Sequence, residues 1–356
     1  MCRCRSHFGR RRTIRSGGFI AVVAVTLGVS CAVGCEQQRR NEPARLDVER
    51  VLGEPGKLPG QFMYPRGIAA GNGQLWVVDK GARVQRLDPE TGTSIEIFQT
   101  PISDQGKPTG LTIAPLPGVP GSTGLYIADT HYNRILIYDT ADENKVPIAE
   151  FGSYGTGPGR FVYPTDIAVL TDDSGIVERI YVSEYGGNDR ISIYDADLNY
   201  ITSFGSFGVA PDHDEVNEGV VFDRPQSIMI DQAKRELIIA DSCNHRVGRF
   251  TLDGELIAWL GAAGDDEFRY PYGLELVQGR GLLVAEYGGN RIRYVDLESG
   301  RSLAKFGEPG RELGQLASPW GIAVIGRDAF VLDSGNNRIQ VIDSPARALA
   351  AVGGSE

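Results

Sequence analysis

The stretch SPWGIAVIGRDAFVLDSGNNRIQVID, residues Ser318–Asp343, carries the pattern that decides the fold of this chain. It opens with a proline and a glycine, continues as two short apolar runs, and then passes through an acid, a polar turn and an arginine into a third apolar run. Short apolar runs separated by turn residues predict β-strands joined by hairpins. The stretch is therefore expected to form three successive antiparallel strands.

The same pattern recurs six times along the chain. The copies span Tyr64–Asp88, Lys107–Asp139, Tyr163–Asp195, Arg224–Phe250, Tyr270–Asp296 and Ser318–Asp343. Their prolines stand at positions 65, 108, 164, 225, 271 and 319. Repeats of this length, each with about four short strands, are typical of a β-propeller. We therefore predict an all-β fold over residues 48–356, a six-bladed β-propeller of four-stranded antiparallel blades.

The repeat begins with P-x-G-I and ends with D-x-x-N-x-R-I-x-x-x-D, loosely kept. This motif resembles the NHL repeat, and the resemblance covers nearly everything from Val48 to the C-terminus. The resemblance implies a six-bladed ring, here of the bacterial exported lipoprotein type.

A near-duplication indicates how the ring closes. VLGEPGKLPGQF (Val51–Phe62) closely matches KFGEPGRELGQL (Lys305–Leu316), so residues 48–53 look like a fourth strand without a blade of its own. The sixth copy lacks a clear fourth strand. We predict that the N-terminal strand completes the last blade and removes both sheet edges. Ala348–Gly353 competes for the same place.

The N-terminus has the composition of an export signal. Six arginines and no acid precede the apolar run Phe19–Gly34, which is short for a membrane span. The run ends in AVGC, which resembles a bacterial lipobox with Cys35 as the lipidated residue, although Ala32 stands where that motif prefers Leu. An ordinary secretory signal or an uncleaved anchor are the alternatives. We expect residues 1–35 to be a lipoprotein-type signal peptide and residues 36–47 a flexible tether.

Charge and cysteine content narrow the function further. Loss of the signal would leave 30 basic against 46 acidic residues, a net charge of −16, which repels polyphosphate backbones. Nucleic acid is therefore not an expected partner. Only Cys243 would remain as a free thiol in the globular part, so no disulfide within the chain is expected. We expect a monomer that meets the membrane only through its lipid anchor.

The pentapeptide EYGGN occurs twice, at Glu184–Asn188 and Glu286–Asn290. In the alignment of the copies its acid corresponds to Asp79, Asp129, Asp241 and Asp333, and an arginine follows each acid after a short turn. Gly-Gly-Asn suits a tight hairpin, and an acid and an arginine across such a turn can pair. A feature present in every blade predicts a structural rather than a catalytic role.

Binding residues are expected where the chain enters the first strand of each blade. Chain direction alternates along a blade, so these entrances and the acid-to-arginine turns emerge on one face. Tyr, Trp and Arg on an accessible rim are typical of recognition surfaces. The candidates are Tyr64, Arg66, Tyr163, Thr165, Asp166, Arg224, Gln226, Tyr270, Tyr272 and Trp320. Asp166 and Ser227 replace the glycine usual at their position; packing of the aromatic residues between blades is the alternative.

Catalytic patterns are weak. Some NHL-type propellers are lyases with histidine-bound zinc at these entrances, but His7, His131, His213 and His245 do not stand there in this chain. Six-bladed lactonases with acidic metal ligands are a further alternative, with Asp166 as a candidate ligand. The acidic stretch Asp212–Glu218 does not fit an EF-hand, and weak Ca²⁺ binding is the most it suggests. No metal or other cofactor is otherwise expected.

These patterns together predict an exported, lipid-anchored NHL-repeat propeller in the periplasm or on the cell surface. Its expected function is to bind an envelope protein, a peptide or a glycan as a scaffold. A propeller enzyme, either a lyase or a lactonase-type hydrolase with its site at the mouth of the central channel, is the alternative.

Overall fold

The computed structural model describes residues 48–210, 219–261, 267–277 and 281–343. The chain divides into two compact units, Met1–Glu42 and Pro43–Glu356, and every described residue belongs to the second. The predicted signal peptide and tether, the acidic stretch 212–218 and the competing strand 348–353 lie outside the described residues. None of the helices among the described residues is long and apolar enough to cross a membrane.

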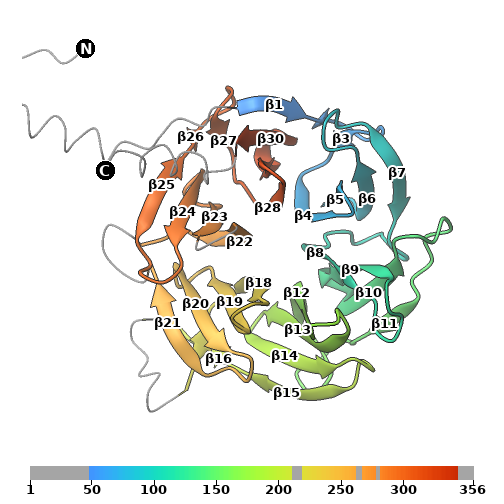
Figure 1. Cartoon of the computed structure of the whole chain (residues 1–356), viewed down its shortest axis with the longest axis vertical. Helices are drawn as coiled ribbons and strands as arrows, with labels where there is room; N and C mark the ends of the chain where they lie inside the picture. The colour runs from blue at the N-terminus through green and yellow to red at the C-terminus, as the bar shows by residue number, and fades with distance from the viewer. Residues whose placement is uncertain (1–47, 211–218, 262–266, 278–280, 344–356) are drawn as a thin grey trace, which may run out of the picture. The chain divides into compact units, whose positions relative to one another are not determined.

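The second unit is the predicted propeller (Figure 1). Blades 1 to 3 are built from β4 (Pro65–Gly71), β5 (Gln74–Asp79), β6 (Arg83–Leu87) and β7 (Ser94–Gln99); β8 (Gly110–Pro115), β9 (Thr123–Asp129), β10 (Arg134–Asp139) and β11 (Ala149–Phe151); and β12 (Tyr163–Thr171), β13 (Val177–Tyr185), β14 (Arg190–Asp195) and β15 (Tyr200–Phe204).

Blades 4 and 5 contain β18 (Pro225–Asp231), β19 (Glu236–Asp241), β20 (Arg246–Thr251) and β21 (Leu256–Leu260); and β22 (Pro271–Val277), β23 (Gly281–Glu286), β24 (Arg291–Asp296) and β25 (Ser302–Phe306). Blade 6 contains β28 (Ile322–Ile325), β29 (Asp328–Asp333), β30 (Arg338–Asp343) and, as its outer strand, β1 (Val48–Leu52). The predicted fold class and blade number are confirmed.

The N-terminal strand closes the ring as predicted. Strand β1 pairs antiparallel with β30, with Val51 opposite Gln340 and Leu52 opposite Ile339. Figure 1 shows β1 on the outer edge of the last blade, beside the first. Closure joins the first and last blades, so neither is left with an unpartnered face.

The hydrophobic core consists of six separate clusters, one between each pair of neighbouring blades. The cluster between blades 6 and 1, for example, joins Leu332 and Ile339 to Leu75, Val77 and the β1 residue Leu52. The middle strands of each blade are buried on both faces because each blade is packed between two others. Their continuous apolar runs follow from that packing.

The loops that connect one blade to the next contain short parallel pairs. They are β2 (Glu54–Pro55) with β3 (Gln61–Phe62), β16 (Ser206–Phe207) with β17 (Val221–Phe222), and β26 (Glu308–Pro309) with β27 (Gln315–Leu316). The duplicated sequences form the same contact in two places: Gln61 Nε2 donates to Glu54 Oε1 at 2.8 Å, and Gln315 Nε2 donates to Glu308 Oε1 at 3.1 Å. The duplicated sequence therefore forms an equivalent connecting loop before blade 1 and before blade 6.

Candidate functional site at the channel mouth

The acid and arginine of every hairpin are paired. The nitrogen-to-oxygen distances lie between 2.6 and 2.8 Å in all six blades. The pairs are Asp79–Arg83, Asp129–Arg134, Glu184–Arg190, Asp241–Arg246, Glu286–Arg291 and Asp333–Arg338. Each of these acids is almost completely buried. The predicted structural role of the acid in EYGGN is thus confirmed.

Each pair also holds the loop that enters its own blade. Glu184 Oε2 accepts the Val162 N–H at 2.8 Å, while Arg190 donates to the Arg160 carbonyl at 3.0 Å. Blades 1, 4, 5 and 6 repeat the bond from the entering loop to the acid. The hairpin turn and the entering loop therefore lie on the same face, as the alternation of strand direction predicts.

The backbone turns sharply at five of the six blade entrances. The residue before the proline has a φ between 49° and 70° at Tyr64, Lys107, Arg224, Tyr270 and Ser318. A residue before proline normally adopts an extended conformation, so this left-handed turn is a departure from the usual preference. In blades 1, 4 and 5 a register shift follows directly, between the proline and the second residue after it, and blade 3 has the same shift without the left-handed residue. Such bulges redirect side chains, here toward the central axis.

Five candidate residues from four blades meet at the mouth of the channel. The Trp320 ring centroid is 6.0 Å from that of Tyr64 and 4.9 Å from that of Tyr272, both edge to face. The Arg66 guanidinium lies over the Trp320 ring at 4.9 Å, and the Arg224 guanidinium lies over the Tyr272 ring at 5.4 Å. The ring of blades thus brings together residues that are far apart in the sequence.

Two of these aromatic residues are less accessible than a rim surface requires. Tyr272 is only 6% exposed and Trp320 7% exposed. Tyr287 stacks on Tyr272 with ring centroids 4.4 Å apart and an interplanar angle of 17°. The expectation of an accessible aromatic rim is therefore wrong for Tyr272 and Trp320, because the left-handed turns at their entrances bring the two rings against one another and beneath the guanidinium groups.

The remaining candidates take different places. Tyr163 is 38% exposed and packs between His131 and Tyr185, at centroid distances of 5.7 and 5.2 Å. Tyr270 packs on His245 at 4.4 Å and makes no ring contact with the mouth cluster. Thr165 is fully buried and donates to the Pro225 carbonyl at 2.6 Å, so its hydroxyl ties blade 3 to blade 4.

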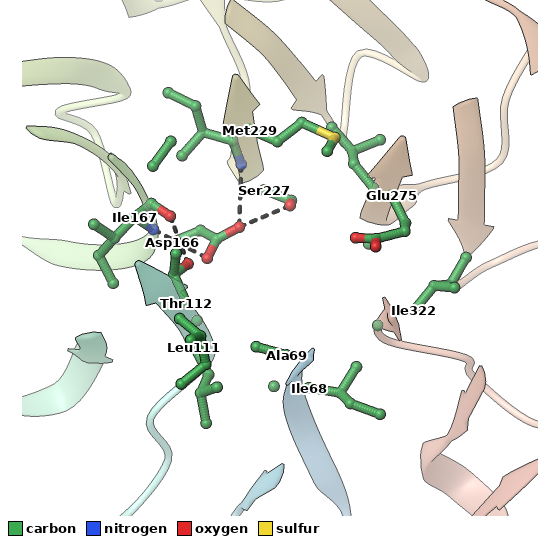
Figure 2. Close-up of a pocket in the computed structure, with 18 of the residues that line it drawn as sticks. Ile68, Ala69, Leu111, Thr112, Asp166, Ile167, Ser227, Met229, Glu275 and Ile322 are labelled. Carbon is green, nitrogen blue, oxygen red and sulfur yellow. Dashed lines mark hydrogen bonds between the residues drawn. The ribbon is translucent and has the colours of Figure 1, made fainter. Parts of the chain in front are cut away.

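A cavity of about 410 Å³ continues from the mouth into the central channel, lined by the innermost strands of the blades. Asp166 and Ser227, the two replacements of glycine, meet there across neighbouring blades: Ser227 Oγ donates to Asp166 Oδ2 at 2.7 Å (Figure 2). The Ile228 N–H donates to the same oxygen at 3.1 Å. The two departures from the repeat thus form one contact.

The cavity holds two carboxyl groups with perturbed acidity. Burial raises the pKa of Asp166 to about 7, against the opposing effect of the bonds from Ser227 and Ile228. Burial also raises the pKa of Glu275 to about 8, and Glu275 Oε1 accepts the Val324 N–H at 3.2 Å. Figure 2 shows both carboxyl groups directed into the channel from different sides. Near neutral pH both groups change charge within an enclosed space.

No group of three or more His, Cys, Asp or Glu side chains suited to hold a metal occurs in the described part of the chain. Asp166, the candidate ligand of the lactonase alternative, is bonded instead to Ser227 and to backbone N–H groups.

Sequence reasoning missed several residues of the site. Tyr185 and Tyr287 are the tyrosines of the two EYGGN motifs, and they lie against Arg224 and Tyr272 respectively. His131 comes from the 3₁₀ turn η1 (Thr130–Tyr132) and contacts Tyr163. In EYGGN the repeated acid belongs to the structural hairpin turn. The tyrosine that follows the acid is the residue that indicates the site at the channel mouth.

Comparison with known proteins supports the repeat and the fold. The family model of the NHL repeat matches residues 222–250 and 316–342. No curated protein matches the sequence significantly.

Solved structures with a similar fold include a streptogramin B lyase, at 18% identity and a TM-score of 0.53 over 81% of this chain and 85% of that one. Virginiamycin B lyase from Staphylococcus aureus is similar at 15% identity and a TM-score of 0.53 over 85% and 98% of the two chains. A protein of unknown function from Bacteroides thetaiotaomicron is similar at 15% identity and a TM-score of 0.59 over 85% and 76%. At these identities the likeness concerns the fold alone.

Proposed function

Because this chain is a six-bladed β-propeller built from NHL repeats, we propose that it acts as a binding scaffold that receives a protein segment, a peptide or a glycan at its channel mouth. One observation carries the proposal. The residues that depart from the repeat gather at this mouth, while the residues common to all blades serve the hairpins. Propellers host many unrelated activities, so the argument rests on this site and not on the fold.

The mouth has the composition and size of a recognition site. Its guanidinium and aromatic groups are the side chains that dominate binding energy at interfaces. The cavity below them, about 410 Å³, falls within the range of small-ligand pockets, which suits one or two inserted side chains or sugar units. A segment bound at the mouth could therefore be anchored both at the rim and in the channel.

We place this activity at the cell envelope on the strength of the N-terminal sequence. The arginine-rich start, the apolar run and Cys35 after AVG support export and lipid anchoring. A scaffold held by its lipid would present the propeller to partners in the periplasm or on the cell surface.

A photo-cross-linking residue at position 163 tests the proposal in intact cells. Tyr163 lies beside the mouth and is 38% exposed, so the replacement reaches a bound partner without removing a buried contact. The matched control is the same residue at Ile95, which is exposed on the outer strand β7. We expect a discrete cross-linked species from position 163 that position 95 does not give, and its loss from the membrane fraction in Cys35→Ala.

Identical products from positions 163 and 95, or none from position 163, would overturn binding at the mouth. The lyase or lactonase-type hydrolase would then be the alternative. The feature that favours it is Asp166, a carboxyl group whose pKa of about 7 suits general acid–base catalysis, in a cavity beside a hydroxyl group.

A further inference from the structure

Two arginines at the channel mouth differ from the other arginines of the described chain. Every other arginine there that is buried or half-buried makes an ion pair with a carboxylate. Arg66 and Arg224 are both half-buried, and neither makes such a pair within the described residues. A guanidinium withdrawn from water without a counter-charge is costly, so this pair calls for an explanation.

Aromatic stacking fixes the position of both groups. Arg66 lies over Tyr64 and Trp320, at 5.8 and 4.9 Å from the ring centroids. Arg224 lies over Tyr185 and Tyr272 at 4.7 and 5.4 Å, and its Nε donates to Gln226 at 3.0 Å. A guanidinium held over aromatic rings presents N–H donors in its own plane, and these donors match the planar geometry of a carboxylate. The two side chains are thus suited to bind a planar anion.

Neither of the two guanidinium groups is paired with a carboxylate among the described residues, although carboxyl groups lie near Arg224. Burial, together with the neighbouring Arg224 guanidinium, lowers the pKa of Arg66, although an arginine remains cationic in proteins. Within the described chain, the buried Nε of Arg66 has no hydrogen-bond partner. Asp223 lies within electrostatic range of Arg224 but makes no ion pair with it, and Asp189 Oδ1 accepts the backbone N–H of Arg224 at 2.6 Å, not a guanidinium N–H. The two guanidinium groups of the mouth therefore lack an ion-pair partner among the described residues.

Resting on the proposed function, we infer that Arg66 and Arg224 form an anion site that binds a side-chain carboxylate of an acidic peptide segment. The two guanidinium groups supply the charge and the donors, and the segment's carboxylate replaces the missing counter-ion. The two guanidinium groups attract a single carboxylate at the mouth. The net negative charge of the rest of the protein repels a polyanion, because a polyanion would extend beyond the mouth.

The arrangement of the aromatic rings favours a peptide over a glycan. A sugar would need an open aromatic face for stacking, but the Tyr272 ring lies between Tyr287 and Arg224, and Arg66 covers Trp320. The rings therefore support the guanidinium groups, and an acidic side chain is the ligand that those groups select.

Two matched libraries of capped pentapeptides test the inference. They are identical except for a central Glu in one and a central Gln in the other, and both are offered to the immobilised full chain. We expect the wild-type protein to retain the Glu library at least about 10-fold better, a difference of about 1.4 kcal/mol. Arg66→Gln and Arg224→Gln should each abolish most of this preference. Arg327→Gln, the same change at an exposed arginine in the turn before β29, should preserve it.

A charge reversal keeps the test independent of simple loss of fold. Arg224→Glu, with thermal unfolding checked by circular dichroism, should instead prefer a third library with a central Lys. Equal retention of the Glu and Gln libraries by wild type, or a preference that survives in the Arg66→Gln/Arg224→Gln double variant, would overturn the anion site. Retention of uronate oligosaccharides in place of the Glu library would overturn the peptide assignment.

The outcome separates this inference from the proposed function. If the cross-linked species at position 163 persists while wild type shows no preference for Glu, the mouth still binds a partner and only the anion site is wrong. If position 163 gives no specific species and no library is retained, the proposed function fails together with the inference.

Discussion

The acid of the EYGGN motif forms the same ion pair with an arginine as the corresponding acids of the other four blades. Glu184 bonds to Arg190 at 2.6 Å and to the Val162 N–H at 2.8 Å, so one carboxylate joins a hairpin to the loop that enters the blade. In blade 5, Glu286 binds both Arg291 and Arg293, at 2.8 and 2.7 Å. A buried carboxylate with this many donors is stabilising only while its partners remain.

Blade 2 shows what happens when one of these bonds is missing. Asp129 pairs with Arg134 at 2.8 Å, but its buried Oδ1 has no hydrogen-bond partner among the residues that the structure describes, and burial raises the pKa of Asp129 to about 6. The loop that enters blade 2 runs through Lys107, whose N–H bonds to the Lys80 carbonyl instead. The entering loop therefore decides how fully each acid is satisfied.

We predict that Glu184→Gln lowers the free energy of unfolding by about 2–4 kcal/mol, because it removes the charge that compensates the largely buried Arg190. Urea denaturation measures the change. The matched control is Glu178→Gln on the same strand, where the Arg235 ion pair is exposed and about 0.5 kcal/mol or less is expected. Similar losses in both variants would contradict a structural role for the EYGGN acid.

At the scale of the elements, the ends of the strands position the residues of the candidate site, whereas the middles of the strands form the hydrophobic core. Continuous apolar runs predict the middle strands of the blades well, because each is buried between neighbouring blades. The left-handed residue before five of the six prolines and the bulge after the proline in four blades are not evident from propensity, since a residue before proline prefers an extended backbone. Both features occur at the entrances that carry Arg66 and Tyr272, and the left-handed residue also precedes the proline before Trp320.

The outer strand of blade 6 is the element on which ring closure depends. Leu52 on β1 is 3% exposed and packs against residues of blades 6 and 1, whereas its neighbour Val51 is 38% exposed. The glycine that follows, Gly53, has a φ of 77°, and a Cβ there would lie 2.1 Å from the Phe62 ring. The strand end and the first loop are therefore packed as one unit.

We predict that Leu52→Ala lowers the free energy of unfolding by about 2–5 kcal/mol, because it leaves a cavity where the ring closes. Val51→Ala changes the same strand at an exposed position and should cost less than about 1 kcal/mol. Both are measured by chemical denaturation. A Leu52→Ala variant as stable as Val51→Ala would mean that another segment occupies the outer edge of blade 6 in solution.

At the scale of the whole molecule, the ring creates a chemical environment that no single blade has. Six inner strands enclose the channel, and the carboxyl groups of Asp166 and Glu275 face it from blades 3 and 5. Their pKa values, about 7 and about 8, are raised because the surrounding blades exclude water from the charged form. A single unfolded repeat would leave both groups at ordinary values.

This shift predicts a pH-dependent stability. Between about pH 5 and pH 8 the folded chain holds a proton on Glu275 that the unfolded chain has lost, so the free energy of unfolding falls as the pH rises. Glu275→Gln keeps an acceptor for the Val324 N–H and removes the titration. We expect the variant to be more stable than wild type at pH 8.5 by on the order of 1–3 kcal/mol, allowing for water in the channel, with little difference at pH 5.

Chemical denaturation of wild type and Glu275→Gln at pH 5 and pH 8.5 measures this difference in the free energy of unfolding. Glu178→Gln serves again as the control, because an exposed glutamate on a blade surface should leave the pH dependence unchanged. A constant difference between Glu275→Gln and wild type at both pH values would contradict the assignment of the raised pKa to Glu275.

The sequence by itself determined the all-β class, the six blades and the acid–arginine pairs, whereas it left two candidate strands for the closure that the structure assigns to β1. These features depend on interactions that recur at fixed spacing: hairpins, apolar strands and a carboxylate opposite a guanidinium. The same local contact is encoded six times in the sequence, so the six copies together predict it. The prediction holds even for a copy such as that with Asp129, whose carboxylate makes fewer hydrogen bonds in the described chain.

Only the tertiary structure decided which side chains meet at the axis. Arg66, Arg224, Tyr272 and Trp320 come from four blades, and no spacing within a repeat relates them. The same holds for the burial of the two aromatic rings, for the contributions of Tyr185 and Tyr287, and for the raised pKa of Glu275. The physical reason is that closing the ring brings distant segments together and removes water from between them, an effect that depends on all six blades at once.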